Sequence, residues 1–289
     1  VNQLTGEKVQ LYLADMGVKG AGSSHKIGVG EPLGQFYGYI SDGLYQVSDF
    51  NYDKASGKYT LKDGIPYRGE KDKVQPGMLK FKNIDGSEDN KITEDDKTVI
   101  GNAFPKFYGG INNTFTYKDF DLSIFLTYSF GNDVLNATKL TNTRTALTNK
   151  NVLAAADWNH RWVTINKETG ALITDPEELA AANQGKTIAC FDDNGSSDNA
   201  VIHSWAVEDG SYLKLSNITL GYTFPKKIVN KIGLSKLRLY ATGNNLLTWT
   251  KYTGYDPEVS TMSNAMTPGV DFGAYPRSRS FVFGVNVAF

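Results

Sequence analysis

Cysteine and histidine are scarce in this 289-residue chain, which has one cysteine and three histidines. The single cysteine, Cys190, excludes an internal disulfide framework and a zinc site built from several cysteines. The histidines, His25, His160 and His203, are far apart in the sequence and form no HExxH-type pair. The chain also lacks a Gly-x-Ser-x-Gly motif. The motifs offer no combination of a nucleophile, a general base and a residue that orients the base. We therefore expect that the chain is not an enzyme.

The chain also lacks an excess of charge and a long apolar segment. Thirty basic residues oppose 31 acidic ones, for a formal net charge of −1, so no strong field attracts nucleic acid or an anionic lipid surface. No stretch reaches the ~18–20 apolar residues of a membrane-spanning helix, and the mean hydropathy is −0.36. A helical membrane protein is excluded, but a membrane β-barrel is not, because alternating barrel strands average to a polar composition.

The sequence begins at Val1 with no methionine, no basic segment and no apolar segment of the kind found in signal peptides. We therefore expect a mature form or a fragment of a longer protein.

Apolar residues alternate strictly along the C-terminal segment. Phe281, Phe283, Val285, Val287 and Phe289 occupy the odd positions, whereas the even positions hold Val282, Gly284, Asn286 and Ala288. Side chains of a β-strand point alternately to its two faces, so one face of this strand is large and apolar and the other is small or polar. Strands of soluble sandwiches alternate in the same way, but a soluble core does not require a terminal Phe.

The same alternation recurs upstream, in residues 108–117, 121–131, 217–224 and 237–242. Only residues 118–120 lie between the first two runs, which predicts a tight hairpin. Leu213 and Leu215 are out of phase with the run that follows them, which predicts a β-bulge near Ser216. Weaker runs lie at 9–13 and 27–40. The total is about seven strands of roughly ten residues, a length that suits tilted barrel strands.

The connections between these strands alternate between short and long. Residues 15–26, 118–120 and 225–234 are the short or moderate ones, and residues 41–106, 132–210 and 250–277 are the long ones. Outer-membrane barrels have short periplasmic turns and long extracellular loops. We therefore predict an all-β chain that forms part of a transmembrane antiparallel β-barrel. Within the longest loop we expect two short helices, around 151–162 and 176–183, the second capped by Asp175.

Aromatic residues cluster at the ends of the predicted strands. Sixteen Tyr, 15 Phe and 4 Trp residues make up 12% of the chain, and aromatic girdles of this kind mark membrane interfaces. Ordinary pairing of aromatic side chains in hairpins is the alternative explanation. The residues concerned are Phe36, Tyr37, Tyr39, Phe107, Tyr108, Phe115, Tyr117, Tyr128, Phe130, Tyr222, Phe224, Trp249 and Tyr252.

An acidic segment within residues 84–96 has the ligand spacing of a calcium loop. Side-chain or backbone oxygens would come from Asp85, Ser87, Asp89, Lys91, Thr93 and Asp96, at positions 1, 3, 5, 7, 9 and 12. Asn90 replaces the usual Gly at position 6, and Asp96 replaces the longer Glu at position 12. The segment predicts a structural Ca2+ site, with an acidic surface turn that binds no metal as the alternative.

A second loop segment, residues 158–162, places His160 and Arg161 between Trp158 and Trp162. Two tryptophans so close together could stack on a sugar or a peptide. They could equally anchor the loop, which we favour.

With these residues in view, the chain resembles the C-terminal third of a SusC/RagA-type TonB-dependent transporter of the Bacteroidota outer membrane. Four stretches carry the resemblance, in the order of the family and over nearly the whole chain. They are Gly30-Glu-Pro-Leu-Gly-Gln-Phe-Tyr-Gly-Tyr39; Pro76-Gly-Met-Leu-Lys-Phe81 with Ile100-Gly-Asn-Ala-Phe-Pro-Lys-Phe-Tyr-Gly-Gly110; Asp209-Gly-Ser-Tyr-Leu-Lys-Leu-Ser-Asn-Ile-Thr-Leu-Gly-Tyr222; and Leu237-Arg-Leu-Tyr-Ala-Thr-Gly-Asn-Asn-Leu-Leu247 with Tyr255-Asp-Pro-Glu258. The acidic loop departs from the family pattern at Ser87 and Asn90.

The resemblance implies a 22-stranded barrel with an N-terminal plug. Residues 1–289 would be the C-terminal part of the barrel domain, without the plug, and would need the rest of the barrel chain. In this family a SusD-like surface lipoprotein closes the extracellular mouth, and TonB acts through the plug to drive import of glycans or oligopeptides. The barrel would lie among lipid and lipopolysaccharide of the Gram-negative outer membrane, and Phe289 would be the signal for barrel insertion.

Two other kinds of protein remain as alternatives. One is a passive porin or an adhesin barrel, without a lid or energy coupling. The other is a secreted β-sandwich that binds glycans through its loop aromatics, with calcium in the acidic loop.

Overall fold

A computed structural model describes residues 10–15, 23–143, 151–189, 201–261 and 265–289. The chain folds as two compact units. Unit 1 comprises Val1–Asn102, Leu135–Val207 and Ser260–Gly273, and unit 2 comprises Ala103–Val134, Glu208–Val259 and Ala274–Phe289. No helix within the described ranges is long and apolar enough to cross a membrane.

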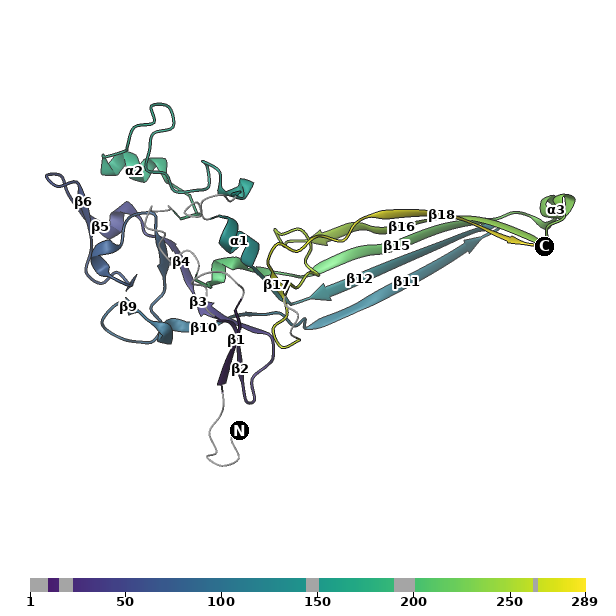
Figure 1. Ribbon diagram of the computed structural model, residues 1–289, viewed down its shortest axis with the longest axis horizontal. Helices are drawn as coiled ribbons and strands as arrows, with labels where there is room; N and C mark the ends of the chain where they lie inside the picture. Colours follow the sequence, from purple (N-terminus) through teal and green to yellow (C-terminus); the bar gives the residue numbers. More distant parts are fainter. Residues whose placement is uncertain (1–9, 16–22, 144–150, 190–200, 262–264) are drawn as a thin grey trace. The chain divides into compact units, whose positions relative to one another are not determined.

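Unit 2 is built on one antiparallel sheet of five long strands, which Figure 1 shows side by side from teal β11 to yellow β18. In spatial order the strands are β11 (Phe107–Tyr117), β12 (Phe120–Phe130), β15 (Tyr212–Thr223), β16 (Lys236–Thr250) and β18 (Ser280–Ala288). All five lie in the segments whose alternation predicted strands, so the all-β prediction is confirmed for this part of the chain.

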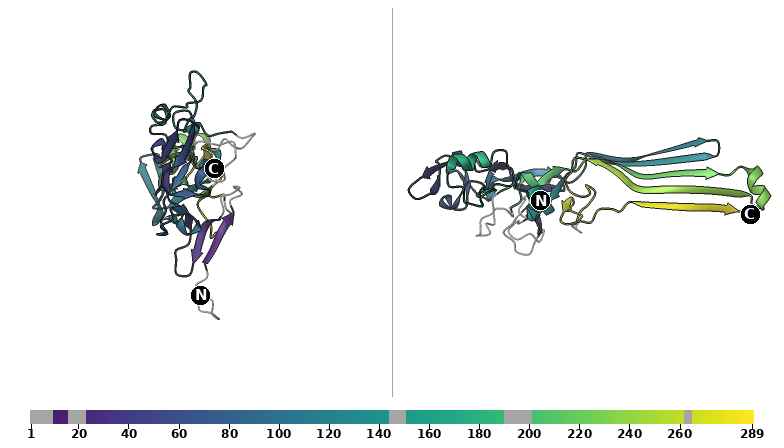
Figure 2. Two further views of the ribbon diagram at one scale, coloured as in Figure 1. Left: turned by 90° about the vertical axis from the view of Figure 1, so that its left-hand side faces the viewer. Right: turned by 90° about the horizontal axis from the view of Figure 1, so that it is seen from above.

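The short connections of this sheet all lie at one end of it. A two-residue turn, Lys118 and Asp119, joins β11 to β12, and Lys118 has a positive φ of 52°. A short helix, α3 (Lys226–Val229), lies in the connection from β15 to β16 and is close to the C-terminus in both Figure 1 and Figure 2. The long connections lie at the opposite end of the sheet. They follow β12 and β16 and precede β15 and β18, as the loop lengths predicted.

The predicted β-bulge at Ser216 is present. The pairing register of β15 with both neighbours shifts between Leu215 and Asn217. On β16, Asn245 lies within the shifted part of this pairing, and its φ is +52°. Because a bulge adds a residue, it brings Leu213 and Leu215 onto the same face as Ile218 and the residues that follow.

The register gives the sheet one apolar and one polar face. The apolar face combines alternate residues from all five strands, among them Ile111, Phe115, Leu122, Ile124, Leu126, Leu215, Ile218, Leu220, Leu237, Leu239, Phe281, Phe283, Val285 and Val287. Many of these side chains are exposed, with Phe283 80% and Phe281 67% accessible. A β-sandwich would bury such a face against a second sheet, so unit 2 lacks the packing of the predicted sandwich alternative.

Aromatic side chains of the apolar face gather at both ends of the sheet. Phe107 lies 5.3 Å from Phe130 at one end, and Phe120 lies 4.7 Å from Tyr222 at the other, measured between ring centroids. Each of these contacts joins residues that are direct cross-strand partners. These aromatic residues therefore lie at the strand ends, as a girdle would require, and they also pair across strands.

Unit 1 consists of short strands and turns. Its largest sheet has the order β1 (Gln10–Asp15), β2 (Ser23–Gly28), β3 (Gln35–Tyr39) and β10 (Lys97–Asn102). Three small pairings follow: β4 (Ser41–Leu44) with β8 (Leu79–Phe81), β5 (Phe50–Asp53) with β6 (Lys58–Leu61), and β7 (Tyr67–Arg68) with β9 (Lys91–Ile92). Residues 27–40 are thus two strands with a turn between them, and not the single strand that the sequence predicted.

The helices of unit 1 are short. α1 spans Ala137–Asn142, and α2 spans Pro176–Ala182. Asp175 caps α2 by accepting the N–H groups of Glu177 and Glu178, which confirms the predicted helix and its cap. The prediction of a helix around 151–162 is wrong, because Ala154–Ala156 forms only a single 3₁₀ turn there.

Buried side chains of the described residues pack into apolar clusters in unit 1. Trp162, 2% exposed, packs with Leu44, Ile173, Leu179 and Ala189, so it anchors its segment as favoured above. The other clusters are Tyr39, Phe81, Ile92 and Val201, and Tyr45, Phe50, Leu61 and Val74.

These clusters correct one expectation about the membrane interface. Phe36 and Tyr39 are 0% and 1% exposed. They pack within unit 1, Phe36 on His25 and Tyr39 on Phe81, and cannot belong to a girdle that faces lipid headgroups.

Candidate functional site: the polar face of the strand sheet

The polar face of unit 2 carries a continuous set of hydroxyl and amide groups. Asn217 donates from Nδ2 to Oδ1 of Asn244 at 2.7 Å, and Asn244 donates to Oγ of Ser280 at 3.0 Å. The hydroxyls of Thr219 and Thr242 are 2.8 Å apart. These bonds join β15, β16 and β18 across the face. Such a surface is suited to contact with water and polar solutes, unlike the opposite face.

An ion pair spans two strands that are not neighbours in this face. Arg238 of β16 reaches across β15 and donates to Asp121 of β12 from Nε at 3.0 Å and from Nη2 at 2.5 Å. Gly221 lies between them, and a Cβ there would overlap the guanidinium and the carboxylate. Bidentate geometry fixes both side chains, so the glycine is needed for this crossing.

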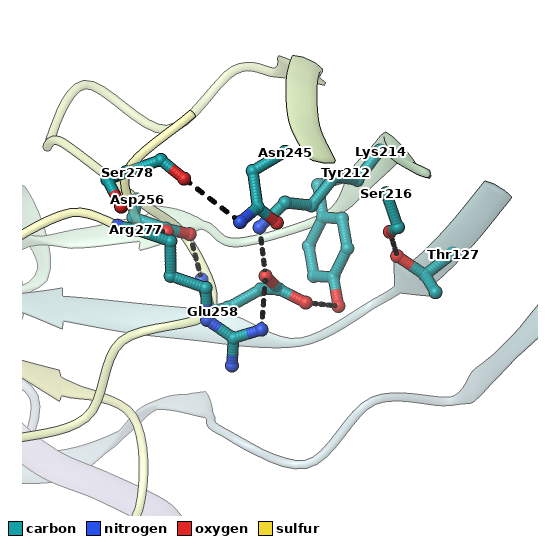
Figure 3. Close-up of polar contacts among 9 residues, drawn as sticks. All are labelled: Thr127, Tyr212, Lys214, Ser216, Asn245, Asp256, Glu258, Arg277 and Ser278. Carbon is teal, nitrogen blue, oxygen red and sulfur yellow. Dashed lines mark hydrogen bonds and ion pairs between the residues drawn. The ribbon is translucent and has the colours of Figure 1, made fainter. Parts of the chain in front are cut away.

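A second polar cluster lies where the sheet meets the connection from β16 to β18 (Figure 3). Glu258 accepts a 2.7 Å hydrogen bond from the Tyr212 hydroxyl and a shorter one from Nζ of Lys214. Arg277 lies 3.6 Å from the same carboxylate. Lys214 is 3% exposed and Glu258 is 15% exposed. Two cations and a phenol therefore hold one largely buried carboxylate.

Backbone contacts of the same connection surround this cluster. The carboxylate of Asp256 accepts the N–H of Glu258 at 3.0 Å and the N–H of Arg277 at 3.4 Å. Asn245 donates to the carbonyl of Ser278 at 3.1 Å. Residues near both ends of the connection are thus fixed to one another and to β15 and β16. The arrangement is a clamp, which we define as Tyr212, Lys214, Glu258 and Arg277.

The electrostatics of the clamp favour the charged form of Glu258. Burial alone raises the pKa of this carboxyl, but hydrogen bonds from Lys214 and Tyr212 outweigh burial, and the pKa is lowered overall. The carboxylate is consequently ionised throughout the neutral range.

A cavity of about 550 Å³ opens on the polar face beside the clamp. Its walls include Tyr108, Phe125, Thr127, Tyr212 and Glu258. Phe125 lies on the polar face and remains 37% exposed. A Cβ at Gly110 would overlap its ring, so this glycine lets the ring lie against β11. A cavity with aromatic walls and a few directed polar groups can bind a solute.

The acidic segment of unit 1 is organised by its own hydrogen bonds. Asp96 is fully buried, and its carboxylate accepts N–H groups of Ile84 at 2.7 Å, Asp85 at 3.2 Å and Thr93 at 2.7 Å. Within the described part of the chain, no three His, Cys, Asp or Glu side chains form a group that could hold a metal ion.

The other predicted calcium ligands form turns in the same segment. Asp85 accepts the N–H of Ser87, and Asp89 accepts the Ser87 hydroxyl and the N–H of Lys91. Asn90 has the left-handed backbone expected at position 6, with a φ of 55°. The loop geometry of the segment is present, and Ca2+ binding by Asp85, Ser87, Asp89, Lys91, Thr93 and Asp96 stays a prediction.

Phe289 follows β18 and is 94% exposed. Its carbonyl accepts a hydrogen bond from the Ser235 hydroxyl at 3.2 Å. Neither the clamp nor the Asp121–Arg238 pair follows from the sequence pattern. A lysine and an arginine at polar-face positions of apolar-alternating strands, Lys214 and Arg238, were the available signal. Cys190 lies outside the described residues.

Comparisons with known proteins agree on one family. No family model matches the chain. TonB-dependent receptor P3 of Formosa agariphila is 33% identical over 265 residues, 90% of this chain and 22% of the receptor. TonB-dependent receptor SusC of Bacteroides thetaiotaomicron is 26% identical over 71% of this chain and 17% of SusC.

The solved structures give the same fold. The RagAB peptide transporter matches 88% of this chain and 22% of its own with a TM-score of 0.54 at 20% identity, and the RagAB peptide importer in its closed-closed state gives a TM-score of 0.55. The chain thus spans about a quarter or less of the length of these relatives. Its relatives are receptors and transporters, which confirms that the chain is not an enzyme. The chain fits a C-terminal portion of a SusC/RagA-like TonB-dependent receptor.

Proposed function

We propose that the chain forms part of the wall of an outer-membrane barrel that imports nutrient oligomers, glycans or oligopeptides, with energy delivered by TonB. The observation that carries this proposal is the two-faced sheet of unit 2. Its apolar face suits contact with lipid and lipopolysaccharide, and its polar face, with the cavity beside the clamp, suits a solute pathway. Strand edges exposed to lipid are not tolerated, so β11 and β18 would pair with the rest of the barrel chain.

The partners follow from the same proposal. A SusD-like lipoprotein would close the extracellular mouth, where the segments 41–106, 132–210 and 250–277 would meet it. TonB would act through the plug of the receptor. Residues 1–289 would all belong to the barrel domain. The similarity to TonB-dependent receptor SusC and to the RagAB peptide transporter supports this proposal of partners.

Phe289 would be the insertion signal of the barrel. It is exposed and continues the apolar alternation of β18. Replacing Phe289 with Ala in the full-length receptor should lower the amount inserted into the outer membrane. Replacing Phe272, an exposed phenylalanine in the connection before β18, should not. Equal amounts of both variants would contradict the role of Phe289.

The experiment that tests the function uses the full-length receptor from native membranes. Extraction in detergent and mass spectrometry of the purified complex should show a surface lipoprotein at comparable abundance. Uptake of fluorescently labelled oligomers should stop when TonB is deleted or the proton gradient is collapsed. Uptake that persists without TonB would favour a passive porin, and a receptor purified without any lipoprotein would argue against the lid.

A further inference from the structure

The connection from β15 to β16 in unit 2 is strongly basic. Residues 224–237 hold no aspartate or glutamate but four exposed lysines, which are Lys226, Lys227, Lys231 and Lys236. No carboxylate of the connection therefore offsets their charge, and the connection is a local source of positive potential. Three of the four lysines lie in one short stretch, residues 226–232, which we call the basic segment.

The basic segment is a short helical element with two different sides. It consists of α3 and the 3₁₀ turn that follows directly, Asn230–Ile232. Ile228 and Ile232 are four residues apart, so they lie on the same side of the element, and they are 54% and 64% exposed. Lys227 and Lys231 are also four residues apart and form the adjoining side. An exposed apolar strip beside a cationic strip is the pattern of a helix that lies in a membrane interface.

Hydrogen bonds to its surroundings hold the basic segment in place. Val229 is 0% exposed, and its carbonyl accepts the N–H of Leu234 at 3.1 Å. Gly233, with a φ of +75°, ends the segment in the left-handed conformation. The N–H of Ser235 then donates to the carbonyl of Ala288 at 2.8 Å, which ties the connection to β18. The two strips thus belong to an ordered element, and little entropy would be lost when they bind a ligand.

The basic segment comes directly after the aromatic end of the apolar face (Figure 1). The rings of Tyr222 and Phe224, which precede it, have centroids 4.9 Å apart, and the ring of Tyr222 lies 4.7 Å from that of Phe120 on β12. Aromatic side chains at the ends of an apolar barrel face lie at the level of lipid headgroups. Charges that follow these aromatics along the chain would therefore lie where lipid phosphates are found.

From these features we infer that the basic segment binds anionic phospholipid in the membrane leaflet next to the short turns of the barrel. The ammonium groups of Lys226, Lys227 and Lys231 pair with lipid phosphates. Ile228 and Ile232 enter the boundary between headgroups and acyl chains. Each basic residue next to an anionic lipid surface adds about fivefold to the affinity. The inference goes beyond the proposed function but rests on it for the position of the sheet in the membrane.

The test uses the full-length receptor, purified in detergent and freed of lipid. A photoactivatable phosphatidylglycerol would be cross-linked to it, and mass spectrometry after chymotrypsin digestion would measure the yield on residues 226–232. Unlabelled phosphatidylglycerol, phosphatidylcholine with the same acyl chains, and lipid A would each compete with the probe. Lipid A represents lipopolysaccharide, the other membrane source of phosphate groups. These three competitors separate lipid charge from lipid type.

Two combined variants and one control divide the contributions of charge and apolar surface. The first variant combines Lys226→Gln, Lys227→Gln and Lys231→Gln, and the second combines Ile228→Ser and Ile232→Ser. Lys236→Gln is the matched control, because Lys236 is an equally exposed lysine nearby that lies on the polar face of the sheet. All five replaced side chains of the variants are exposed, so the receptor should still fold.

Phosphatidylglycerol should compete about a hundredfold better than phosphatidylcholine in the wild type, because three lysines each add about fivefold. The triple Gln variant should lose this difference, and Lys236→Gln should keep it. The double Ser variant should bind both phospholipids more weakly and keep the difference between them. Equal competition by both phospholipids, an unchanged preference in the triple Gln variant, or stronger competition by lipid A would overturn the inference.

Failure of this inference is separable from failure of the proposed function. A receptor with TonB-dependent uptake whose basic segment shows no preference for anionic phospholipid would keep the importer and lose the lipid site. A receptor without TonB-dependent uptake would lose the importer whatever lipid the basic segment binds.

Discussion

The two units treat their large apolar side chains in opposite ways. Unit 1 buries them, with Phe36, Leu135 and Val270 at 0% exposure and Trp162 at 2%. The sheet of unit 2 exposes them, with Phe283 80% accessible. One polypeptide therefore contains a region built around dry cores and a region whose apolar surface faces outward. The mean hydropathy of the whole chain, −0.36, does not reveal this difference, because it counts residues without regard to their exposure.

The largest expected effect is loss of the core of unit 1 on replacing Trp162 with Ala. The indole fills a cluster with Leu44, Ile173 and Leu179, and deletion of a buried Trp side chain costs about 3–5 kcal/mol. Hydrogen exchange of the full-length receptor should show faster exchange in residues 151–189, while the strands of unit 2 stay protected. Trp249→Ala, at a 52% exposed position, is the control. Equal effects of both variants would contradict the difference between the units.

The next effect concerns the apolar face of unit 2. If this face contacts lipid, Phe283→Arg should cost about 2–4 kcal/mol, the cost of a cation near the middle of a barrel strand. The fraction of receptor that stays folded in unheated gel electrophoresis would measure it.

The adjacent Val282→Arg is the matched control, because Val282 points to the polar face of the same strand. It should be tolerated far better. Equal losses for the two variants would show that the faces are not separated into lipid and water, and the barrel proposal would fail.

The two units also differed in how well their structure could be predicted from sequence. In unit 2 each strand is long and one face is uniformly apolar, so the period of two was visible, and even the bulge at Ser216 followed from a phase change. In unit 1 the strands have two to six residues. So few residues show no period. The sequence of segment 27–40 consequently predicts one strand, and it predicts that Phe36 and Tyr39 lie at a membrane interface, whereas both side chains are buried.

The candidate site was harder to predict for a different reason. Lys214 and Glu258 are 44 residues apart in the sequence, and Asp121 and Arg238 are 117 apart. No local pattern connects such pairs, because strand order and register decide which side chains meet. The motif that local spacing did predict, the acidic segment, is built from neighbours within one loop.

A smaller effect is expected when the charge of Glu258 is removed. Its pKa is lowered in the folded protein, so its contribution to stability is complete above its ordinary pKa of about 4.3 and is lost as the pH falls through the lowered value. Protease cleavage within residues 251–261 should therefore be slow at neutral pH and accelerate in acid.

Glu258→Gln leaves the buried Lys214 without a counter-charge, so cleavage should be faster at neutral pH and less dependent on acid. Asp119→Asn, an exposed turn residue, should keep the wild-type profile. An acid response of the Gln variant equal to that of the wild type would assign the response to another group.

The smallest effect separates two origins of order in the acidic segment of unit 1. If the segment binds calcium, Ca2+ should slow protease cleavage of residues 84–96 in the wild type relative to chelator. Asp85→Ala should lose that response, and it should also lose the turn in which Asp85 accepts the N–H of Ser87 at 2.7 Å. Asp85→Asn separates these losses, because an amide oxygen still accepts this hydrogen bond but carries no charge for the ion. Glu88→Ala, at position 4 of the loop, should respond to Ca2+ like the wild type. A wild type cleaved equally with and without Ca2+ would show that hydrogen bonds to Asp96 order the segment by themselves.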